Sequence, residues 1–559
     1  MKKTLLLLCG LVMCSYAQAA DFETAKDAVK NMGVGWNLGN TLDANDASKT
    51  WTTTAEHETC WGQPVTKPEL LKMMKEAGFS AIRVPVTWYQ EMDSNGKVNA
   101  AWMNRVKEVV DYVIDQGMYC ILNVHHDTGA DSNTYKSWLK ASGNNYNTNK
   151  AKYEGLWKQI AETFKDYDQK LLFEAFNEML DEKNTWNEPV DKTDGYKAIN
   201  DYAKSFVTIV RATGGNNKDR NLVVNTYSAS STGDAMKQLE LPEETGHIIF
   251  QLHSYPNWTS ESNAKNEIDN LLNNIKKNLL NRAPVIIGEY ATFTTWPSNI
   301  DYYNTDRKVA LYAMDYLVKK AKENGVGTFY WMGLSDGTYR TLPAFHQADL
   351  AQTLIKAYYG STDGYKYPTP DDYQTVYTIN YNSQWGELFL YGGWNNTTSF
   401  KLSDYKSIRV ELDNDYSDKL QIKVYGDIIG KNDDGSAKHN EQYIALQAGS
   451  ATSTLDFDAT KLGSSVYRIT LQALEGTALT AKLNDVKLIK TDDTEVSGSV
   501  TVGWGCTVSS ESTPKTTAIQ GIRFQKAEAD DAIYNLHGQR VSNPRKGIYI
   551  QNGRKVVMK

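Results

Sequence analysis

The feature that most constrains the fold of this chain is an alternation of short apolar runs with amphipathic segments between residues 34 and 333. Segments such as KPELLKMMKEAG and VKEVVDYVIDQG carry apolar residues at helical spacing and precede the second and third runs. A helical crossover returns the chain to the same end of a parallel sheet. The runs, interpreted as strands, are VGWNLG (34–39), SAIRVPV (80–86), YCILNVHH (119–126), LLFEAFNE (171–178), NLVVNTY (221–227), HIIFQLHSY (247–255), PVIIGEY (284–290) and GTFYWMG (327–333).

Eight strands joined by helices predict an α/β fold, a (β/α)8 TIM barrel with long insertions that occupies residues 20–362. The alternative is an open doubly wound sheet, which does not require eight strands. In a barrel, functional residues gather at the carboxyl ends of the strands. The sequence therefore directs attention to the residues that close each apolar run.

The pattern changes after the barrel. Residues 370–492 contain short alternating stretches such as SIRVELDND and KLQIKVYG, separated by Gly, Asp, Asn and Ser, which predicts a β-sandwich. Trp385, Trp394, Tyr381 and Tyr391 lie among its Gly and Asn residues, where they could form a surface that stacks on sugars. The other interpretation is an immunoglobulin-like spacer whose aromatic residues pack internally.

The two ends of the chain have the character of targeting segments. Residues 1–19 combine two lysines, an apolar run and a small-residue cleavage motif, as a secretory signal peptide does, and no later run is long enough to span a membrane. Residues 515–559 contain Asn552-Gly553 between two apolar stretches, which predicts a hairpin. This tail resembles the sorting domains of type IX secretion, so we expect a secreted or cell-surface protein.

The net charge of −7 argues against nucleic acid as a partner, because phosphate binding requires a basic patch. We expect a monomer without a cofactor. The glycines of MGVGWNLGN have the spacing G-x-G-x-x-x-G, which does not fit a dinucleotide loop.

Polar or ionisable side chains close the apolar runs far more often than packing alone would require. They are Asn37, Arg83, His125, His126, Asn177, Glu178, His253, Tyr255, Glu289 and Trp331.

Two carboxyl groups on separate strands can act as the acid/base and the nucleophile in hydrolysis of a glycosidic bond. Glu178 lies at the end of the fourth run and Glu289 near the end of the seventh. A separation of about 5 to 5.5 Å between them would indicate a retaining mechanism. Arg83 could hold one of them ionised, while burial keeps the other protonated.

Three other features invite competing interpretations. His125 and His126 could suggest a metal site, but adjacent strand residues point to opposite faces, so no metal is expected. Asn187-Glu188-Pro189 lies in a polar stretch, and we interpret Glu188 as a solvated loop residue. Glu174 precedes Glu178 at an even spacing and should have a hydrogen-bonding partner inside the barrel.

The barrel region resembles glycoside hydrolase family 5, in the subgroup of endoglucanases, xyloglucanases and mixed-linkage glucanases. The matching motifs are GWNLGNTLDA (35–44), WGQP (61–64), GFSAIRVPVTW (78–88), NVHH (123–126), FNE (176–178), HSY (253–255), GEY (288–290) and YWM (330–332). Gln63 departs from the Asn that the subgroup more often has, which could alter a loop beside the cleft.

The resemblance implies a role for each matched residue. Glu178 would be the acid/base and Glu289 the nucleophile, with Arg83 and Tyr255 positioning the nucleophile. Asn177 would bind the sugar 2-hydroxyl, His125 and His253 would line the site, and Trp331 would form a platform under the sugar. Asn37 would belong to the first strand end.

Together these features predict a secreted retaining endo-β-1,4-glucanase acting on cellulose, mixed-linkage glucan or xyloglucan. The alternatives are an endo-xylanase or mannanase on the same scaffold, or a polysaccharide-binding protein without activity.

Overall fold

The computed structural model describes residues 22–255, 258–291, 307–476 and 478–515, together with three strands of the C-terminal tail. The expected signal peptide, residues 1–19, lies outside the described residues. The chain divides into two compact units, Met1–Asp371 and Asp372–Lys559. Each is described by itself.

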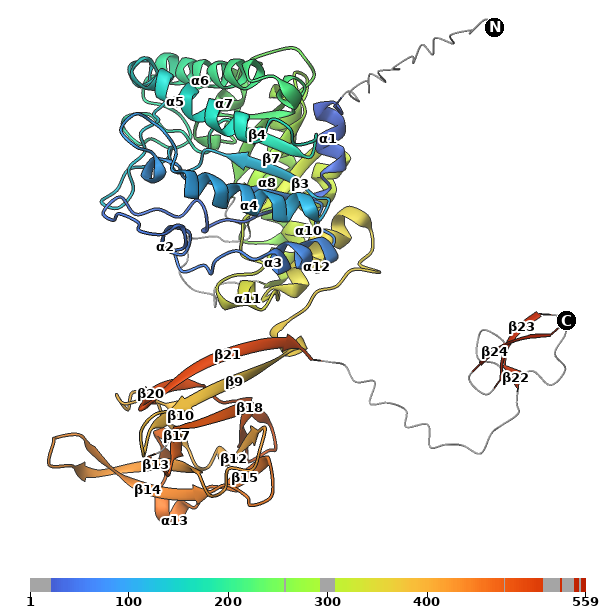
Figure 1. Cartoon of the computed structure of the whole chain (residues 1–559). Coiled ribbons are helices and arrows are strands. Elements are labelled where there is room, and N and C mark those ends of the chain that lie inside the picture. The colour runs from blue at the N-terminus through green and yellow to red at the C-terminus, as the bar shows by residue number, and fades with distance from the viewer. Residues whose placement is uncertain are drawn as a thin grey trace, which may run out of the picture. The chain divides into compact units, whose positions relative to one another are not determined.

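The first unit is a closed barrel of eight parallel strands in sequential order, in which β8 pairs with β1 (Figure 1). This confirms the predicted fold class. All the strands except β7 end earlier than the apolar runs do, so several site residues follow a strand instead of closing it. The strands are β1 (Val34–Asn37), β2 (Ala81–Val84), β3 (Tyr119–Asn123), β4 (Leu171–Glu174), β5 (Leu222–Asn225), β6 (Ile248–Ser254), β7 (Val285–Tyr290) and β8 (Val326–Tyr330).

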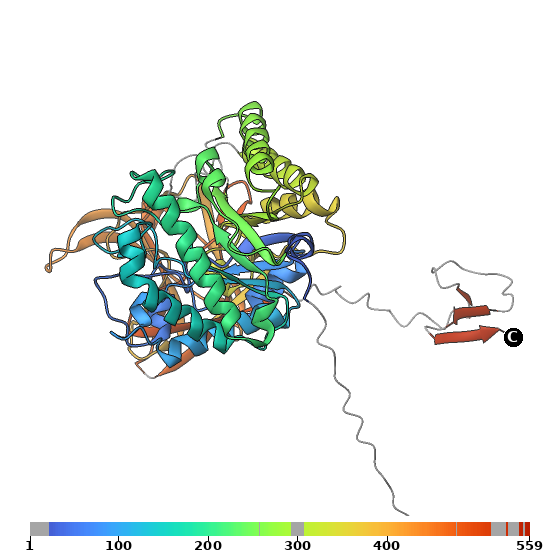
Figure 2. The same ribbon diagram turned by 90° about the horizontal axis from the view of Figure 1, so that it is seen from above.

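Amphipathic helices surround the barrel, and α5 and α6 lie side by side on its outside (Figures 1 and 2). Several begin at a side-chain cap, such as Ser142 before α5 and Ser260 before α8. None of the described helices is both long and apolar enough to cross a membrane. The helices are α1 (Ala25–Asn31), α2 (Thr54–Glu58), α3 (Pro68–Glu76), α4 (Ala100–Asp115), α5 (Gly143–Thr163), α6 (Lys192–Ala212), α7 (Gly233–Gln238), α8 (Glu261–Asn278), α10 (Arg307–Glu323), α11 (Thr338–Thr341) and α12 (Ala348–Tyr359).

The interior of the barrel is apolar at one end and polar at the other. The apolar end is a cluster that includes Ile121, Leu172, Val223, Ile249 and Ile286. Two residues further along their strands lie the buried polar residues Asn123, Glu174, Asn225, Gln251 and the glycine Gly288. Because side chains alternate along a strand, both sets point into the barrel. The polar set lies at the carboxyl ends, where the site is expected.

The second unit begins with antiparallel sheets that have a hydrophobic core of their own, as a β-sandwich does. One sheet has the order β14-β13-β17-β10-β20 and the other β15-β12-β18-β9-β21, with β19 paired to β18. The strands are β9 (Tyr373–Tyr381), β10 (Glu387–Gly392), β11 (Phe400–Lys401), β12 (Tyr405–Leu412), β13 (Leu420–Lys431), β14 (Ala437–Ala445), β15 (Thr452–Asp456), β16 (Ser465–Val466), β17 (Arg468–Ala473), β18 (Leu479–Lys490), β19 (Glu495–Ser497), β20 (Thr501–Trp504) and β21 (Cys506–Pro514), with the short helix α13 (Ala459–Leu462).

The sheets extend past the expected boundary at residue 492, because β20 and β21 pair with β10 and β9. Residues 506–514 look like a spacer in the sequence because β21 is an edge strand whose side chains are mostly exposed. In the tail, β22 (Ile533–Tyr534), β23 (Gly547–Gln551) and β24 (Arg554–Met558) form a small sheet. Gln551 pairs with Arg554, as the predicted hairpin requires.

Candidate active site

Glu178 and Glu289 lie together at the carboxyl end of the barrel. Glu289 belongs to β7, whereas Glu178 follows β4, which ends at Glu174. A carboxylate oxygen of Glu178, one of Glu289 and a ring nitrogen of His253 all lie within 4.8 Å of one another. The two carboxyls therefore face one small space.

Both oxygens of Glu289 accept hydrogen bonds that stabilise its ionised form. Arg83 Nη1 donates to Oε1 at 2.6 Å, and the Tyr255 hydroxyl donates to Oε2 at 2.6 Å. Burial raises the pKa of Glu289 above its usual value, although neighbouring His253 and Arg83 and the Tyr255 hydrogen bond oppose the rise. Glu289 is thus a buried carboxylate held in place by a cation and a phenol.

Arg83 is fully buried and binds more than Glu289. Its Nε and Nη2 donate to the two oxygens of Glu174 at 2.6 and 2.8 Å. Nη1 also donates to Asn37 Oδ1 at 3.0 Å, and Nη2 to Asn177 Oδ1 at 2.8 Å. Burial alone would raise the pKa of Glu174, but the charge and hydrogen bonds of Arg83 outweigh it and lower the pKa. Glu174 is the partner that compensates Arg83 inside the barrel.

Glu178 has a different environment. Its Oε1 lies 2.9 Å from His253 Nδ1, which is also 3.5 Å from Glu289 Oε2. Burial raises the pKa of Glu178 to about 7, whereas burial lowers the pKa of His253 to about 4. His253 is therefore neutral near pH 7, and because its Nδ1 faces oxygens of both carboxyls we assign the ring proton to Nδ1, which donates to Glu178. The other oxygen, Oε2, is free to carry a proton into the cleft.

The carboxyls open into a cleft of about 900 Å³ that is lined by Trp61, His125, Glu289 and Trp331, among others. A second hollow of about 500 Å³ shares Glu178 with it and is lined by Asn187 and Ser228. Trp331 stacks parallel to His125 with ring centroids 5.9 Å apart. Trp186, in the loop after β4, lines both hollows, so the cleft continues on either side of Glu178.

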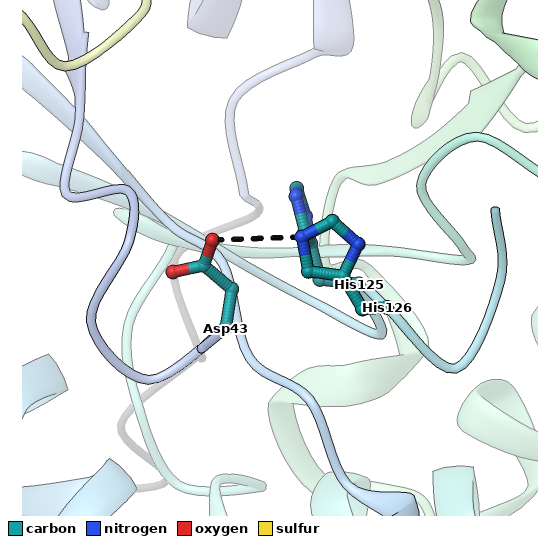
Figure 3. Close-up of side chains that lie close together, drawn as sticks. All are labelled: Asp43, His125 and His126. Atoms are coloured by element: carbon teal, nitrogen blue, oxygen red, sulfur yellow. Dashed lines mark ion pairs between the residues drawn. The ribbon is translucent and has the colours of Figure 1, made fainter. Parts of the chain in front are cut away.

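Strand geometry led us to expect that His125 and His126 would face opposite sides. In the structure they do not. Strand β3 ends at Asn123, so His125 and His126 are free of its alternation, and their ring centroids lie 4.6 Å apart. Asp43, in the loop after β1, points at them, with Oδ2 3.8 Å from His126 Nε2 (Figure 3). Ligand atoms of these three residues lie within 4.8 Å of one another.

Hydrogen bonding nevertheless makes His125 a poor metal ligand. The Nδ2 group of Asn123 lies 3.0 Å from His125 Nδ1 and donates to Glu174 Oε1 at 3.1 Å. Val86 N donates to Asn123 Oδ1 at 3.1 Å, which fixes the orientation of this amide. His125 Nδ1 therefore accepts and Nε2 carries the proton, so the ring has no lone pair left for a cation.

Comparison with known proteins identifies the family of the barrel region. Residues 45–336, more than half of the 559-residue chain, match the cellulase family, glycosyl hydrolase family 5. The chain belongs to this family. Endoglucanase A of Clostridium longisporum is 34% identical to this glycosyl hydrolase family 5 chain over 332 residues, which are 56% of this chain and 60% of that protein. The chain thus spans less than two thirds of that relative.

Solved structures of the same family resemble the barrel. A broad-specificity endoglucanase from an uncultured bacterium is 57% identical, with a TM-score of 0.59, and the match covers 61% of this chain and 96% of that one. A family 5 enzyme from Prevotella bryantii B14, solved as a mutant with a xyloglucan tetradecasaccharide, is 42% identical with a TM-score of 0.56. That match covers 60% of this chain and 99% of the other.

The structure places each residue that the sequence singled out. Residues at or near the two carboxyls are Arg83, His125, Asn177, His253, Tyr255 and Trp331. His126 lies further along the cleft wall, beside Trp61. Asn37 does not face the cleft: its amide donates to Gly288 O at 2.9 Å and accepts from Arg83, so it positions Arg83.

Asp43, Asn123 and Trp61 also contribute to the site, although in the sequence they stand only as members of the motifs GWNLGNTLDA, NVHH and WGQP. No local signal marks any of the three individually. Gln63 binds Asp336 and the Gly337 amide, which joins its loop to the one after β8. Glu188 pairs with Lys192 on the surface at 2.6 Å.

Proposed function

We propose that this chain is a secreted retaining endo-β-1,4-glucanase, which hydrolyses internal linkages of cellulose, mixed-linkage glucan or xyloglucan by double displacement. The observation that carries the proposal is the pair Glu178 and Glu289, with oxygens within 4.8 Å and unlike partners. Inverting enzymes place their carboxyls about 6.5 to 9.5 Å apart to admit a water, and retaining enzymes about 5 to 5.5 Å apart. The short separation supports the retaining course.

In the first step an oxygen of Glu289 attacks the anomeric carbon while Glu178 gives its proton to the departing glycosidic oxygen. The bond to the leaving sugar breaks and a glycosyl-enzyme ester forms. In the second step Glu178, now ionised, removes a proton from water, whose oxygen attacks the same carbon and releases Glu289. Both carboxyls return to their starting states.

The surrounding residues provide what these steps require. Arg83 and Tyr255 hold Glu289 in one orientation before attack. Arg83 also binds Asn177 Oδ1, which leaves the amide nitrogen of Asn177 to donate to a sugar hydroxyl in the cleft. The stacked pair Trp331 and His125 offers a flat surface for a sugar ring.

Several observations support the substrate class and the location. The relatives are named endoglucanases, and the Prevotella bryantii enzyme was solved with xyloglucan. A cleft open on both sides of Glu178 suits attack within a chain rather than at its end. The sequence of residues 1–19 supports export from the cell.

The test is hydrolysis of a panel of cellulose, mixed-linkage glucan, xyloglucan, xylan and mannan, with the anomer of the first product followed by NMR. We expect β-products from the glucans, and loss of hydrolysis with retained glucan binding in Glu289→Gln. Activity should survive EDTA, because His125 offers no lone pair to a metal. An α-product would contradict the mechanism, preferential cleavage of xylan or mannan would contradict the substrate, and absence of any hydrolysis would indicate a binding protein.

A further inference from the structure

Asp43, in the loop after β1, is a buried carboxylate with one oxygen that the fold does not use. The residue has no exposed surface. Its Oδ1 accepts a hydrogen bond from the Thr41 amide at 2.9 Å. Its Oδ2 is buried and has no hydrogen-bond partner among the described residues. A buried carboxylate oxygen without a donor is costly, so its presence needs an explanation.

This oxygen points at the ring of His126. It lies 3.8 Å from His126 Nε2, and the other ring nitrogen, Nδ1, lies on the side of the ring away from Asp43 (Figure 3). The gap is about 1 Å longer than a hydrogen bond. A small rotation of the ring closes it, because the His126 side chain is 30% exposed and neither ring nitrogen is bound by another described residue.

Backbone contacts hold Asp43 and His126 together. The Thr87 hydroxyl donates to the carbonyl oxygen of Asp43 at 2.7 Å and accepts from the His126 amide at 3.2 Å. Thr87 follows β2, and its own amide donates to Leu42 O at 2.9 Å. The loops after β1, β2 and β3 are therefore joined at this point. The approach of the carboxylate to the ring is thus a property of the backbone and not of a freely rotating side chain.

The charges of the two groups favour one position for the ring proton. Burial lowers the pKa of His126 to about 4, so the ring is neutral near pH 7. Burial raises the pKa of Asp43 to about 6, so this carboxyl is mostly ionised at the same pH. A neutral imidazole has one N–H and one lone pair, and a carboxylate attracts the N–H. The proton is therefore favoured on Nε2, which leaves Nδ1 as an acceptor.

His126 borders the part of the cleft that holds the glycone, the sugars on the side of the scissile bond that Glu289 attacks. Glu289 and His126 both line the 900 Å³ hollow, whereas the described residues that line the 500 Å³ hollow do not include Glu289. The attacked sugar therefore lies in the larger hollow. Glu289 Oε1 is 3.9 Å from His125 Nε2, and the His126 ring lies between His125 and Trp61, with centroids 4.6 and 5.2 Å away. His126 thus faces a glycone sugar beyond the attacked one.

We propose that Asp43 is a positioning residue, which keeps the ring proton of His126 on Nε2 so that Nδ1 accepts a hydrogen bond from a glycone sugar beside Trp61. A sugar hydroxyl can donate to Nδ1 while the C–H face of the same sugar packs on the tryptophan ring. The identity of the ligand rests on the function proposed for the barrel, whereas the position of the proton does not. Asp43 acts only through His126, because its own free oxygen is buried.

The position of the proton is measured by nitrogen NMR of the full chain labelled with nitrogen-15 histidine at pH 7. The His126 signals are identified by their loss in His126→Phe, which retains a ring. We expect Nε2 to carry the proton in the unchanged chain. In Asp43→Asn the amide oxygen should stay with the Thr41 amide, so that the NH2 group faces His126 and moves the proton to Nδ1. A proton on Nδ1 in the unchanged chain, or the same tautomer in Asp43→Asn, would overturn the proposal.

Kinetics test whether sugar binding depends on this proton. The substrates are dinitrophenyl cellobioside, which has two glycone sugars, and dinitrophenyl glucoside, which has one. Asp43→Asn and His126→Phe should each raise KM for the cellobioside by about three- to tenfold, with a smaller effect on kcat. Both should alter kcat/KM for the glucoside less. Because Asp43 acts through His126, the double variant should bind the cellobioside no more weakly than His126→Phe alone.

Asp46→Asn is the matched control, because this carboxylate lies in the same loop but binds Ser48 and is not among the described residues that line the cleft. Its KM and its His126 signals should match those of the unchanged chain, and circular dichroism verifies that each variant is folded. An unchanged KM in folded Asp43→Asn, or additive losses in the double variant, would overturn the proposal. A chain that hydrolyses neither substrate would instead count against the function of the barrel, and the NMR comparison would still decide the role of Asp43.

Discussion

At the scale of single residues, Glu174 and Glu178 show how neighbours decide what a carboxyl does. They are four positions apart, but Glu174 receives two hydrogen bonds from Arg83, whereas the protein donor to Glu178 is the neutral His253. The pKa of Glu174 is lowered and that of Glu178 is raised to about 7. The first is a fixed charge and the second a group able to exchange protons.

The raised pKa of Glu178 predicts the alkaline limb of the pH profile. Glu178 must be protonated for the first step, so kcat/KM on cellotetraose should fall tenfold per pH unit above about pH 7. Glu178→Ala should lower kcat on glucans by about 10²- to 10⁴-fold. A dinitrophenyl cellobioside has a leaving group that needs no proton. With this substrate, the pH profile for the rate of dinitrophenol release by Glu178→Ala should therefore show no alkaline limb.

Glu188→Ala is the control for this prediction, because Glu188 is a surface residue paired with Lys192. Its rate and pH profile should match those of the unchanged chain. An alkaline limb that persists in Glu178→Ala would show that another group sets it.

A different outcome is expected for Glu174→Ala. Removing this carboxylate leaves Arg83 buried with less compensation, and breaking a buried ion pair costs about 3 to 5 kcal/mol of folding free energy. Urea unfolding followed by tryptophan fluorescence should show this loss, and Glu174→Gln, which retains one acceptor oxygen, should lose less. Equal stability of Glu174→Ala and the unchanged chain would contradict the role assigned to this pair.

At the scale of elements, the close packing of β6 against β7 positions Glu289, the proposed nucleophile. Gly288 precedes Glu289, and a Cβ at Gly288 would lie 2.4 Å from the Gln251 side chain of β6. No side chain fits there without displacing Gln251 or the strand. The glycine is therefore part of how β7 presents Glu289.

Gly288→Ala should destabilise the protein by about 1 to 3 kcal/mol, as overpacking does in protein cores. It should also lower kcat, because a shift of β7 moves Glu289 relative to Arg83. Gly155→Ala is a matched control: Gly155 lies within α5 and a Cβ there meets nothing within 4 Å. Gly155→Ala should raise the free energy of unfolding of the protein by about 0.5 to 1 kcal/mol. The stability of both variants is measured by thermal unfolding and their activity by kinetics on cellotetraose. A Gly288→Ala variant as stable and active as Gly155→Ala would refute the packing argument.

At the scale of the whole molecule, the chain has two units with separate hydrophobic cores. The proposed catalytic residues all come from the first unit.

Separate cores predict separable unfolding. In calorimetry Glu174→Ala should lower the melting temperature of one transition, assigned to the barrel, and leave the transition of the sandwich unchanged. Leu471→Ala, which removes a buried side chain of the sandwich core, should do the reverse. A single transition that both substitutions shift together would show that the two units unfold as one.

The sequence by itself determined the eight strands, the helices between them and both carboxyls. These features are local: alternating or continuous apolar runs identify each strand, and the barrel rule assigns function to the residues near its carboxyl end. Strand ends were less well determined, since β4 ends at Glu174 although the apolar run continues to Phe176.

Only the tertiary structure decided which side chains meet. Arg83 and Glu289 are 206 residues apart, and the sequence did not indicate that Arg83 also binds Glu174 and Asn177. Asp43 joins the two histidines because loops after β1 and β3 converge. The sheets of the sandwich pair strands that are distant in sequence, such as β10 with β17 and β9 with β21. The periodicity of a sequence indicates which way a side chain points. Contacts between distant segments decide which other side chain it meets.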